Sequence, residues 1–237
     1  MRGAHQEIVL IREALEGFIA PEIATAILFD ALAQTSTPPS NLHEARTFVT
    51  GPLSEVVRRR VRSDEVTSIV RLVQGAIDAA IDRDGVDVDV DFDPAASAPG
   101  DGPTATQQMS TITRPVPVVV LAASSTFADR LGLCLGEDRV YASTVASAQG
   151  LRKAIFAQSP MLVVFDGSSL AELDPEPIAE VLRGFPDNVV PVLWAGETAW
   201  GARLMTIAPR KPALVTLERK EGIEPLCDLV LSRFRGA

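Results

Sequence analysis

The fold of this 237-residue chain is decided by the stretch Ser159-Pro160-Met161-Leu162-Val163-Val164-Phe165-Asp166. Its centre, residues 161–165, is an unbroken run of large apolar side chains, and Asp166 and Gly167 close it with a turn signal. A short apolar run with such a boundary is typical of a strand that is buried on both faces, as strands of parallel sheets are. The stretch therefore predicts one strand of a parallel sheet.

Four further strand-like runs accompany it in the C-terminal half. Residues 117–121 and 189–194 are mainly apolar, and 139–142 and 213–217 are weaker runs. Amphipathic segments alternate with these runs, and this alternation predicts an α/β fold with a five-stranded parallel sheet. The helical segments are predicted at 127–135, 146–157, 174–183, 197–208 and from 222 or 224 to 234.

Residues 1–81 predict a small all-α bundle instead. Apolar side chains recur at helical spacing from Ile8 to Phe18, which indicates a first helix. Pro21 suits the first residue of a second helix, because its missing N–H is not needed there. A loop is expected at 35–40.

The rest of this bundle is predicted from caps and breakers. Asn41 followed by Glu44 marks the start of a third helix. The sequence Thr-Gly-Pro at 50–52 is expected to break it, and Pro52 to open the next helix. A last helix is expected over residues 63–81.

Residues 82–114 are expected to form an acidic linker rich in Pro, Gly and Ala. They contain seven acidic and two basic residues, so they supply −5 of the chain's net charge of −9. With few large apolar side chains, such a segment cannot offset the entropy cost of ordering. The linker begins with an alternation of apolar side chains and aspartates that is typical of an edge strand, at Val86, Val88, Val90 and Phe92. The aspartates do not predict a calcium-binding EF-hand loop, because the glycine that such a loop needs is absent.

The negative net charge argues against a nucleic-acid partner, because phosphate binding needs a basic surface. The basic cluster of the chain consists of Arg58, Arg59, Arg60 and Arg62. Because three consecutive arginines spread over most of a helical turn, the cluster is open to three interpretations. It is a solvated helix face, a surface for an acidic protein or the acidic linker, or a DNA contact.

The chain is expected in the cytoplasm of a bacterium. No apolar run approaches the roughly 18 residues of a membrane span, and the first residues lack a secretory signal. Cys134 and Cys227 are too few for a disulfide framework and form no CxxC pair, so both are expected to be buried thiols.

Residues 115–237, with five strands and five helices, resemble the receiver domain of two-component response regulators. The stretch 159–166 is similar to the third strand of that family, which ends in the phospho-accepting aspartate, and 191–196 is similar to its fourth strand. The resemblance implies a flavodoxin-like sheet of order 2-1-3-4-5, with any site at the carboxyl ends of the strands. It also implies Asp166 as the candidate phospho-acceptor.

The chemistry departs from the family pattern. The acidic pair that holds Mg²⁺ after the first strand falls at Ala122 and Ala123, whose methyl groups cannot bind a cation that needs oxygen ligands. The hydroxyl residue after the fourth strand falls at Ala195 or Gly196. The resemblance is therefore to a degenerate receiver, a pseudo-receiver, for which we expect neither a metal nor a cofactor.

The same resemblance suggests where partners bind. The family lysine after the fifth strand falls at Arg219 or Lys220. Receivers commonly bind partners through the fourth helix, fifth strand and fifth helix, a surface that here would include Trp200, Leu204 and Met205 with the two cations. Trp200 is either an interface anchor or a core residue.

The sequence predicts a non-catalytic signalling adaptor whose helical domain and pseudo-receiver bind protein partners or a second copy of the chain. One alternative is a phosphorylatable response regulator that uses Asp166 and has the helical domain as its effector. Another is a DNA-binding regulator acting through residues 58–62. An enzyme is the weakest interpretation, because His5 and His43 lie outside the α/β half and no Gly-rich nucleotide motif follows the first strand.

Overall fold

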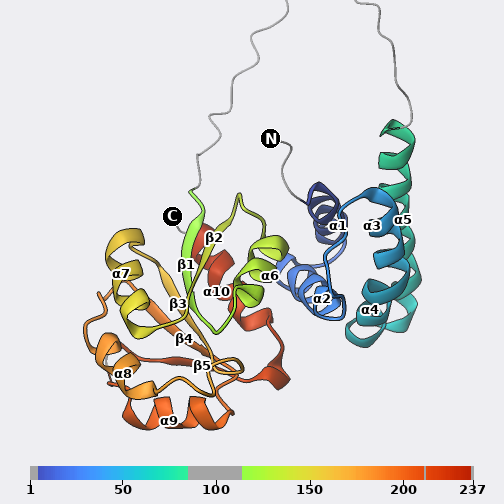
Figure 1. The fold of residues 1–237 in the computed structure, drawn as a ribbon. Helices are drawn as coiled ribbons and strands as arrows, with labels where there is room; N and C mark the ends of the chain where they lie inside the picture. Colours follow the sequence, from blue (N-terminus) through green and yellow to red (C-terminus); the bar gives the residue numbers. More distant parts are fainter. Residues whose placement is uncertain (1–4, 85–113, 211, 236–237) are drawn as a thin grey trace, which may run out of the picture.

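The computed structural model describes residues 5–84, 114–210 and 212–235, whose arrangement is shown in Figure 1. Five parallel strands form one sheet in the order β2-β1-β3-β4-β5, and helices precede it along the chain. The predicted flavodoxin-like α/β fold is confirmed, including its strand order. The strands are β1 (Val116–Leu121), β2 (Val140–Val145), β3 (Leu162–Asp166), β4 (Val190–Trp194) and β5 (Val215–Leu217).

The centre of the sheet is built from the apolar runs. Val120 of β1 lies beside Val164 of β3, which lies beside Val192 of β4. Every residue of β3 is buried, as a strand covered on both faces requires. The bounds of the two edge strands differ from the prediction. Strand β2, predicted at 139–142, extends to Val145 because its polar residues still pair with β1. Strand β5, predicted at 213–217, starts at Val215 because it pairs only with the last three residues of β4.

Helices cover both faces of the sheet. On one face lie α6 (Thr126–Leu135) and α10 (Glu224–Arg235), and on the other lie α7 (Ala148–Gln158), α8 (Pro175–Arg183) and α9 (Ala199–Ile207). Because successive strand residues point to opposite faces, Val118 and Val120 pack toward α6 and α10. Val119 and Leu121 pack toward α7, α8 and α9.

The helical region comprises residues 5–84 and follows the predicted capping signals. Pro21 is the first residue of α2, and the Asn41 side chain accepts a hydrogen bond from the Glu44 amide (2.9 Å) at the start of α3. Of the described helices, none combines the length and the apolar run needed to cross a membrane. The elements are α1 (Gln6–Glu16), α2 (Pro21–Ala33), α3 (Leu42–Phe48), the π-helix η1 (Val49–Leu53), α4 (Ser54–Arg60) and α5 (Ser63–Asp84).

The predicted break at residues 50–52 is wrong, because the chain stays helical there as the π-helix η1. Pro52 has no N–H to give to an α-helical ladder, and a wider turn accommodates it. The Ser54 hydroxyl donates to the carbonyl oxygens of Thr50 (2.8 Å) and Gly51 (2.9 Å) in this turn. The helix therefore continues directly into α4.

The helical region packs on the face of the sheet that α6 and α10 cover (Figure 1). Helix α2 lies against both α6 and α10, and α1 lies against α6. Buried apolar side chains form one continuous cluster from α1 and α2 to the strands. The sequence pattern predicts two domains on either side of a linker, and in the structure the apolar cores of these two parts are continuous. The strand-like alternation predicted at residues 86–92 lies outside the described residues.

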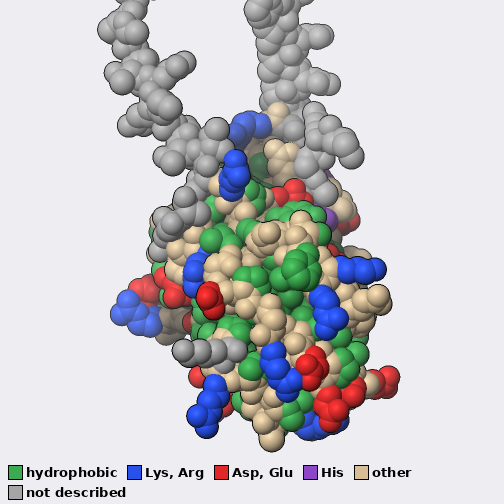
Figure 2. Space-filling model, turned by 90° about the vertical axis from the view of Figure 1, so that its left-hand side faces the viewer, with side chains coloured by type: hydrophobic (Ala, Val, Ile, Leu, Met, Phe, Trp, Pro, Cys, Tyr) green, Lys and Arg blue, Asp and Glu red, His purple; other side chains and the backbone are tan. Residues whose placement is uncertain are grey.

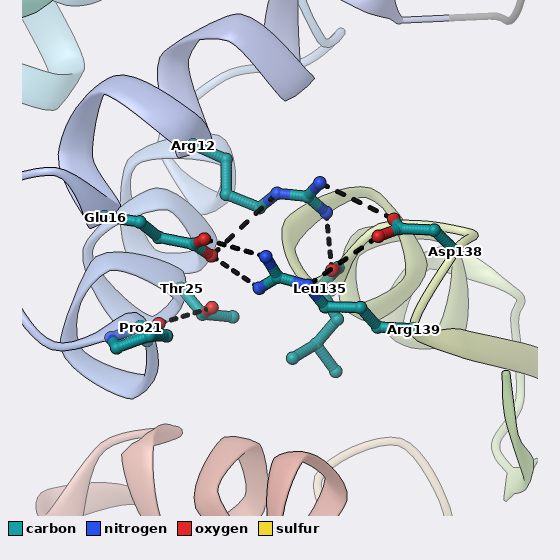
Figure 3. A network of polar contacts seen from close by, with 7 residues as sticks. All are labelled: Arg12, Glu16, Pro21, Thr25, Leu135, Asp138 and Arg139. Carbon is teal, nitrogen blue, oxygen red and sulfur yellow. Dashed lines mark hydrogen bonds and ion pairs between the residues drawn. The ribbon is translucent and has the colours of Figure 1, made fainter. Parts of the chain in front are cut away.

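A partly buried network of charges connects α1 to the α6–β2 connection (Figure 3). Arg12, 3% exposed, donates to the Leu135 carbonyl oxygen and faces Asp138 at 3.5 Å. Arg139 donates two hydrogen bonds to Glu16, at 2.6 and 2.8 Å, and these bonds raise the pKa of Arg139. Glu16 also lies 3.9 Å from the Arg12 guanidinium, so one carboxylate serves two cations.

Gly136, which ends α6, makes room for this network. Its φ of 93° is in the region that favours glycine. A Cβ atom at this position would come within 1.7 Å of Arg12 Nη1. Glycine is therefore required twice here, by backbone conformation and by the approach of Arg12.

Replacing Arg12 is expected to destabilise the whole fold. Arg12→Met keeps the apolar stem but leaves the buried Leu135 carbonyl without its donor, and should lower the free energy of unfolding by about 2–3 kcal/mol. Urea denaturation followed by circular dichroism measures this loss. The control is Arg152→Met on α7, an exposed position where a change within about 0.5 kcal/mol is expected; equal effects of both variants would contradict the role of the network.

The reactivity of the two cysteines tests whether the helical region stays packed on the α/β region. Cys134 on α6 and Cys227 on α10 are both buried in the shared cluster, and desolvation raises the pKa of each thiol. Near pH 8 both should react with a disulfide reagent only slowly in the native protein and rapidly in denaturant. Arg12→Met should speed the native reaction at low denaturant; unchanged protection in that variant would show that the network does not hold the helices in place.

Candidate functional site

An open cleft of about 380 Å³ lies at the carboxyl ends of the strands, the edge where flavodoxin-like sheets place their sites. Its walls come from both regions: α2 and α4 on one side, and the α/β loops on the other. Its charged lining consists of four cations and two carboxylates, namely Arg60, Arg130, Arg219, Lys220, Asp30 and Asp166.

Asp166 is the last residue of β3 and lies 5% exposed in the cleft. Its Oδ1 accepts hydrogen bonds from the Ser168 amide (3.1 Å) and the Ser168 hydroxyl (2.5 Å). The next amide, that of Gly167, donates to the Trp194 carbonyl oxygen at 2.9 Å. This carboxylate thus caps the turn that ends the strand.

The side chains of Ala122 and Ala123, which follow β1, offer no ligand for a cation. Ala122 is buried and donates its N–H to the Val145 carbonyl oxygen (3.0 Å), while the amide of the exposed Ala123 donates to the Ser169 hydroxyl (3.2 Å). Within the described parts of the chain, no three His, Cys, Asp or Glu residues are grouped to hold a metal. Asp166 therefore stands without a second carboxylate at the end of β1.

The loop after β4 carries no hydroxyl toward the cleft either. Ala195 adopts a positive φ of 57°, and Gly196 follows it. The nearby Thr198 hydroxyl donates to the Ala195 carbonyl (3.0 Å) and accepts from the Gly201 amide (3.1 Å), which caps α9. Thr198 is therefore used for helix capping.

Arg219 and Lys220 both line the cleft, from the short 3₁₀-helix Arg219–Glu221 after β5. Lys220 pairs with Glu218 at 2.5 Å, which raises the pKa of Lys220. The Arg219 amide donates to the Glu197 carboxylate at 3.4 Å, whereas its guanidinium forms no ion pair with a described residue. Of the two candidates for the lysine of the family pattern, Lys220 is therefore paired with a carboxylate, whereas the Arg219 guanidinium is not.

Arg130 is a cleft residue that sequence reasoning missed. Its guanidinium carbon lies 5.1 Å from the centroid of the Phe29 ring, a cation–π contact between α6 and α2. Phe29 meets Phe127 edge-on at 5.6 Å, and Phe127 lies 6.1 Å from Trp194. Only the packing of α2 on α6 reveals this arrangement, and no local sequence signal announces it.

The arginine cluster is largely neutralised. Arg60 joins three helices through Asp30 of α2 (2.6 Å) and Glu224 of α10. Arg59 and Arg62 pair with glutamates on their own helical turns. Of the four arginines, only Arg58 lacks an ion pair among the described residues, so the cluster is not a free basic face.

The predicted partner surface needs correction at two positions. Trp200 and Leu204 are buried at 3% and 0% exposure, and the Trp200 indole N–H donates to the Leu173 carbonyl oxygen at 2.7 Å. Both side chains face inward because α9 packs them against α8 and the sheet. Met205 remains exposed on α9.

Comparison with known proteins adds no assignment: no family model, curated protein or solved structure matches the chain. Any function must be inferred from the residues themselves.

Proposed function

We propose that the chain is a non-catalytic signalling adaptor whose α/β region is a pseudo-receiver that binds protein partners without being phosphorylated. The observation that supports this most directly is the setting of Asp166. Alanines occupy the neighbouring positions that would hold Mg²⁺, and the other carboxylate of the cleft, Asp30, is paired with Arg60. Phosphoryl transfer to Asp166 would then lack its main charge neutralisation.

The side chains of the cleft do not favour an enzyme. Its described lining contains neither His nor Cys, so no Ser–His or Cys–His pair is formed around Asp166. The two histidines belong to the helical region, His5 before α1 and His43 in α3. A binding role fits this chemistry better than catalysis does.

The face of the sheet opposite the helical region is covered by α7, α8 and α9, and the outer side of this layer is open to partners. Figure 2 shows the side where α7 and α8 lie, with hydrophobic side chains among basic and acidic ones. A large aromatic side chain of this layer is exposed, namely Phe156 on α7 (81%). Exposed aromatics of this kind commonly anchor interfaces.

One alternative retains specific support. Asp166 does line the cleft together with Arg219 and Lys220, so a phosphorylatable response regulator remains the second candidate. A DNA-binding regulator has less support, since only Arg58 of the arginine cluster is without an ion pair to a described residue.

Acetyl phosphate with Mg²⁺ should leave the protein unmodified. Without an acidic pair beside Asp166, metal-assisted transfer is not expected, and intact-mass spectrometry should show no added phosphoryl group. Asp166→Asn provides the matched control for adducts elsewhere. A phosphoryl adduct on the unaltered chain that disappears in Asp166→Asn would support the response-regulator alternative instead.

Partner binding should not depend on Asp166. A photo-crosslinking phenylalanine analogue placed at Phe156 in cells that make the protein should give a discrete protein adduct, retained in the Asp166→Asn background. The same analogue at Arg71, exposed on α5, is the control position. Loss of the adduct with Asp166→Asn, or equal labelling from both positions, would contradict a phosphorylation-independent surface at α7.

A further inference from the structure

We infer that the cleft at the strand ends binds a small phosphate ester, with Arg130 and Arg219 as its anion-binding side chains. This goes beyond the adaptor function, which needs no small ligand. The inference starts from the walls of the cleft. They come from α2, α4, α6 and the loops after β3 and β5, so segments far apart in the chain converge on one concave space.

The charge of this space favours an anion. Four cations line the cleft against two carboxylates, in a chain whose net charge is −9. Arg60 is neutralised by Asp30 and Glu224, and Lys220 by Glu218. Arg130 and Arg219 are the cleft cations whose guanidinium groups form no ion pair with a described residue, and guanidinium forks match phosphate oxygens well.

Arg130 is held in place before any ligand arrives. Its guanidinium lies over the Phe29 ring, and its stem belongs to the helix α6. Such fixation reduces the entropy that an arginine loses when it binds an anion. The charge is therefore presented to the cleft without being used by a carboxylate of the described chain.

Hydroxyl groups also line the cleft. The hydroxyls of Ser124, Thr126 and Ser168 belong to the cleft lining. Thr126 also begins α6, where no side chain caps the free amides and Asp129 is the acidic residue of the first turn. The Ser168 hydroxyl donates to Asp166 (2.5 Å) and the Ser124 hydroxyl to Thr126 (3.2 Å), so the two guanidinium groups are the main donors for phosphate oxygens in the cleft.

The cleft also has an apolar component. Phe29, Phe127 and Trp194 contribute to its lining, and a volume of about 380 Å³ lies in the range of small-molecule sites. A bare phosphate ion would leave this part unused. We therefore assign the ligand as a phosphate monoester with an aromatic or apolar body.

Asp166 distinguishes this site from a phospho-acceptor site. Its carboxylate at the floor of the cleft repels a phosphate bound nearby, because like charges at short range raise each other's energy. Asp166→Asn should therefore strengthen phosphate-ester binding. A covalent acceptor aspartate would show the opposite behaviour, since its removal abolishes phosphate uptake.

Titration calorimetry on the full chain in metal-free buffer tests this, with adenosine 5′-monophosphate, inorganic phosphate and adenosine as the probes. The nucleotide should bind more tightly than inorganic phosphate, and adenosine should give no signal. Arg219→Gln, at an exposed position, and Arg130→Gln should each weaken nucleotide binding about tenfold or more. Arg152→Gln on α7 is the matched control and should leave binding unchanged.

Four results would overturn the inference: no nucleotide binding, adenosine binding as tightly as the nucleotide, unchanged binding in Arg219→Gln, or weaker binding in Asp166→Asn. If Arg130→Gln does not fold, Arg219→Gln and Asp166→Asn still decide the question. The outcome is independent of the acetyl phosphate experiment, which reports covalent modification and not reversible binding.

Discussion

The burial of α2 is the constraint on which the rest of the structure depends. Residues 24–29 of this helix are all buried, so it has no wide polar face to present to water. A helix that is apolar nearly all round must be enclosed by other elements. Here α1, α4, α6 and α10 surround it, and the helical region and the sheet consequently share one core.

Charged groups determine how the helical region is oriented on the sheet, which apolar packing alone does not determine. Hydrophobic contact is non-directional, whereas Arg12 and Arg139 can reach their partners in only one seating of α1 on the α6–β2 connection. Arg60 does the same near the carboxyl ends of the strands, where it joins α4, α2 and α10. The two networks therefore hold the helical region at opposite ends of the sheet.

The sequence predicted the parts of this fold that depend on local pattern. The apolar residues 162–165 form a strand that is buried on both faces, and Pro21 and Asn41 begin helices through their own backbone and side-chain chemistry. Pairing between distant segments was not predictable in this way. From the sequence Arg60 is a solvated or partner-binding residue until Asp30 and Glu224 are placed beside it. Trp200 is either an interface anchor or a core residue until the packing of α9 shows that it is buried.

The same limits apply to the cleft. The sequence analysis identified the alanines at positions 122 and 123 and the cations Arg219 and Lys220, but it did not identify Arg130. Arg130 enters the cleft because α2 brings Phe29 beneath it, and Arg219 because β5 ends beside β4. In this cleft Asp166 lies with two guanidinium groups that form no ion pair with a described residue. The packing of α2 thus bears on the charge of the cleft as well as on stability, because Phe29 and Asp30 of α2 form one of its walls.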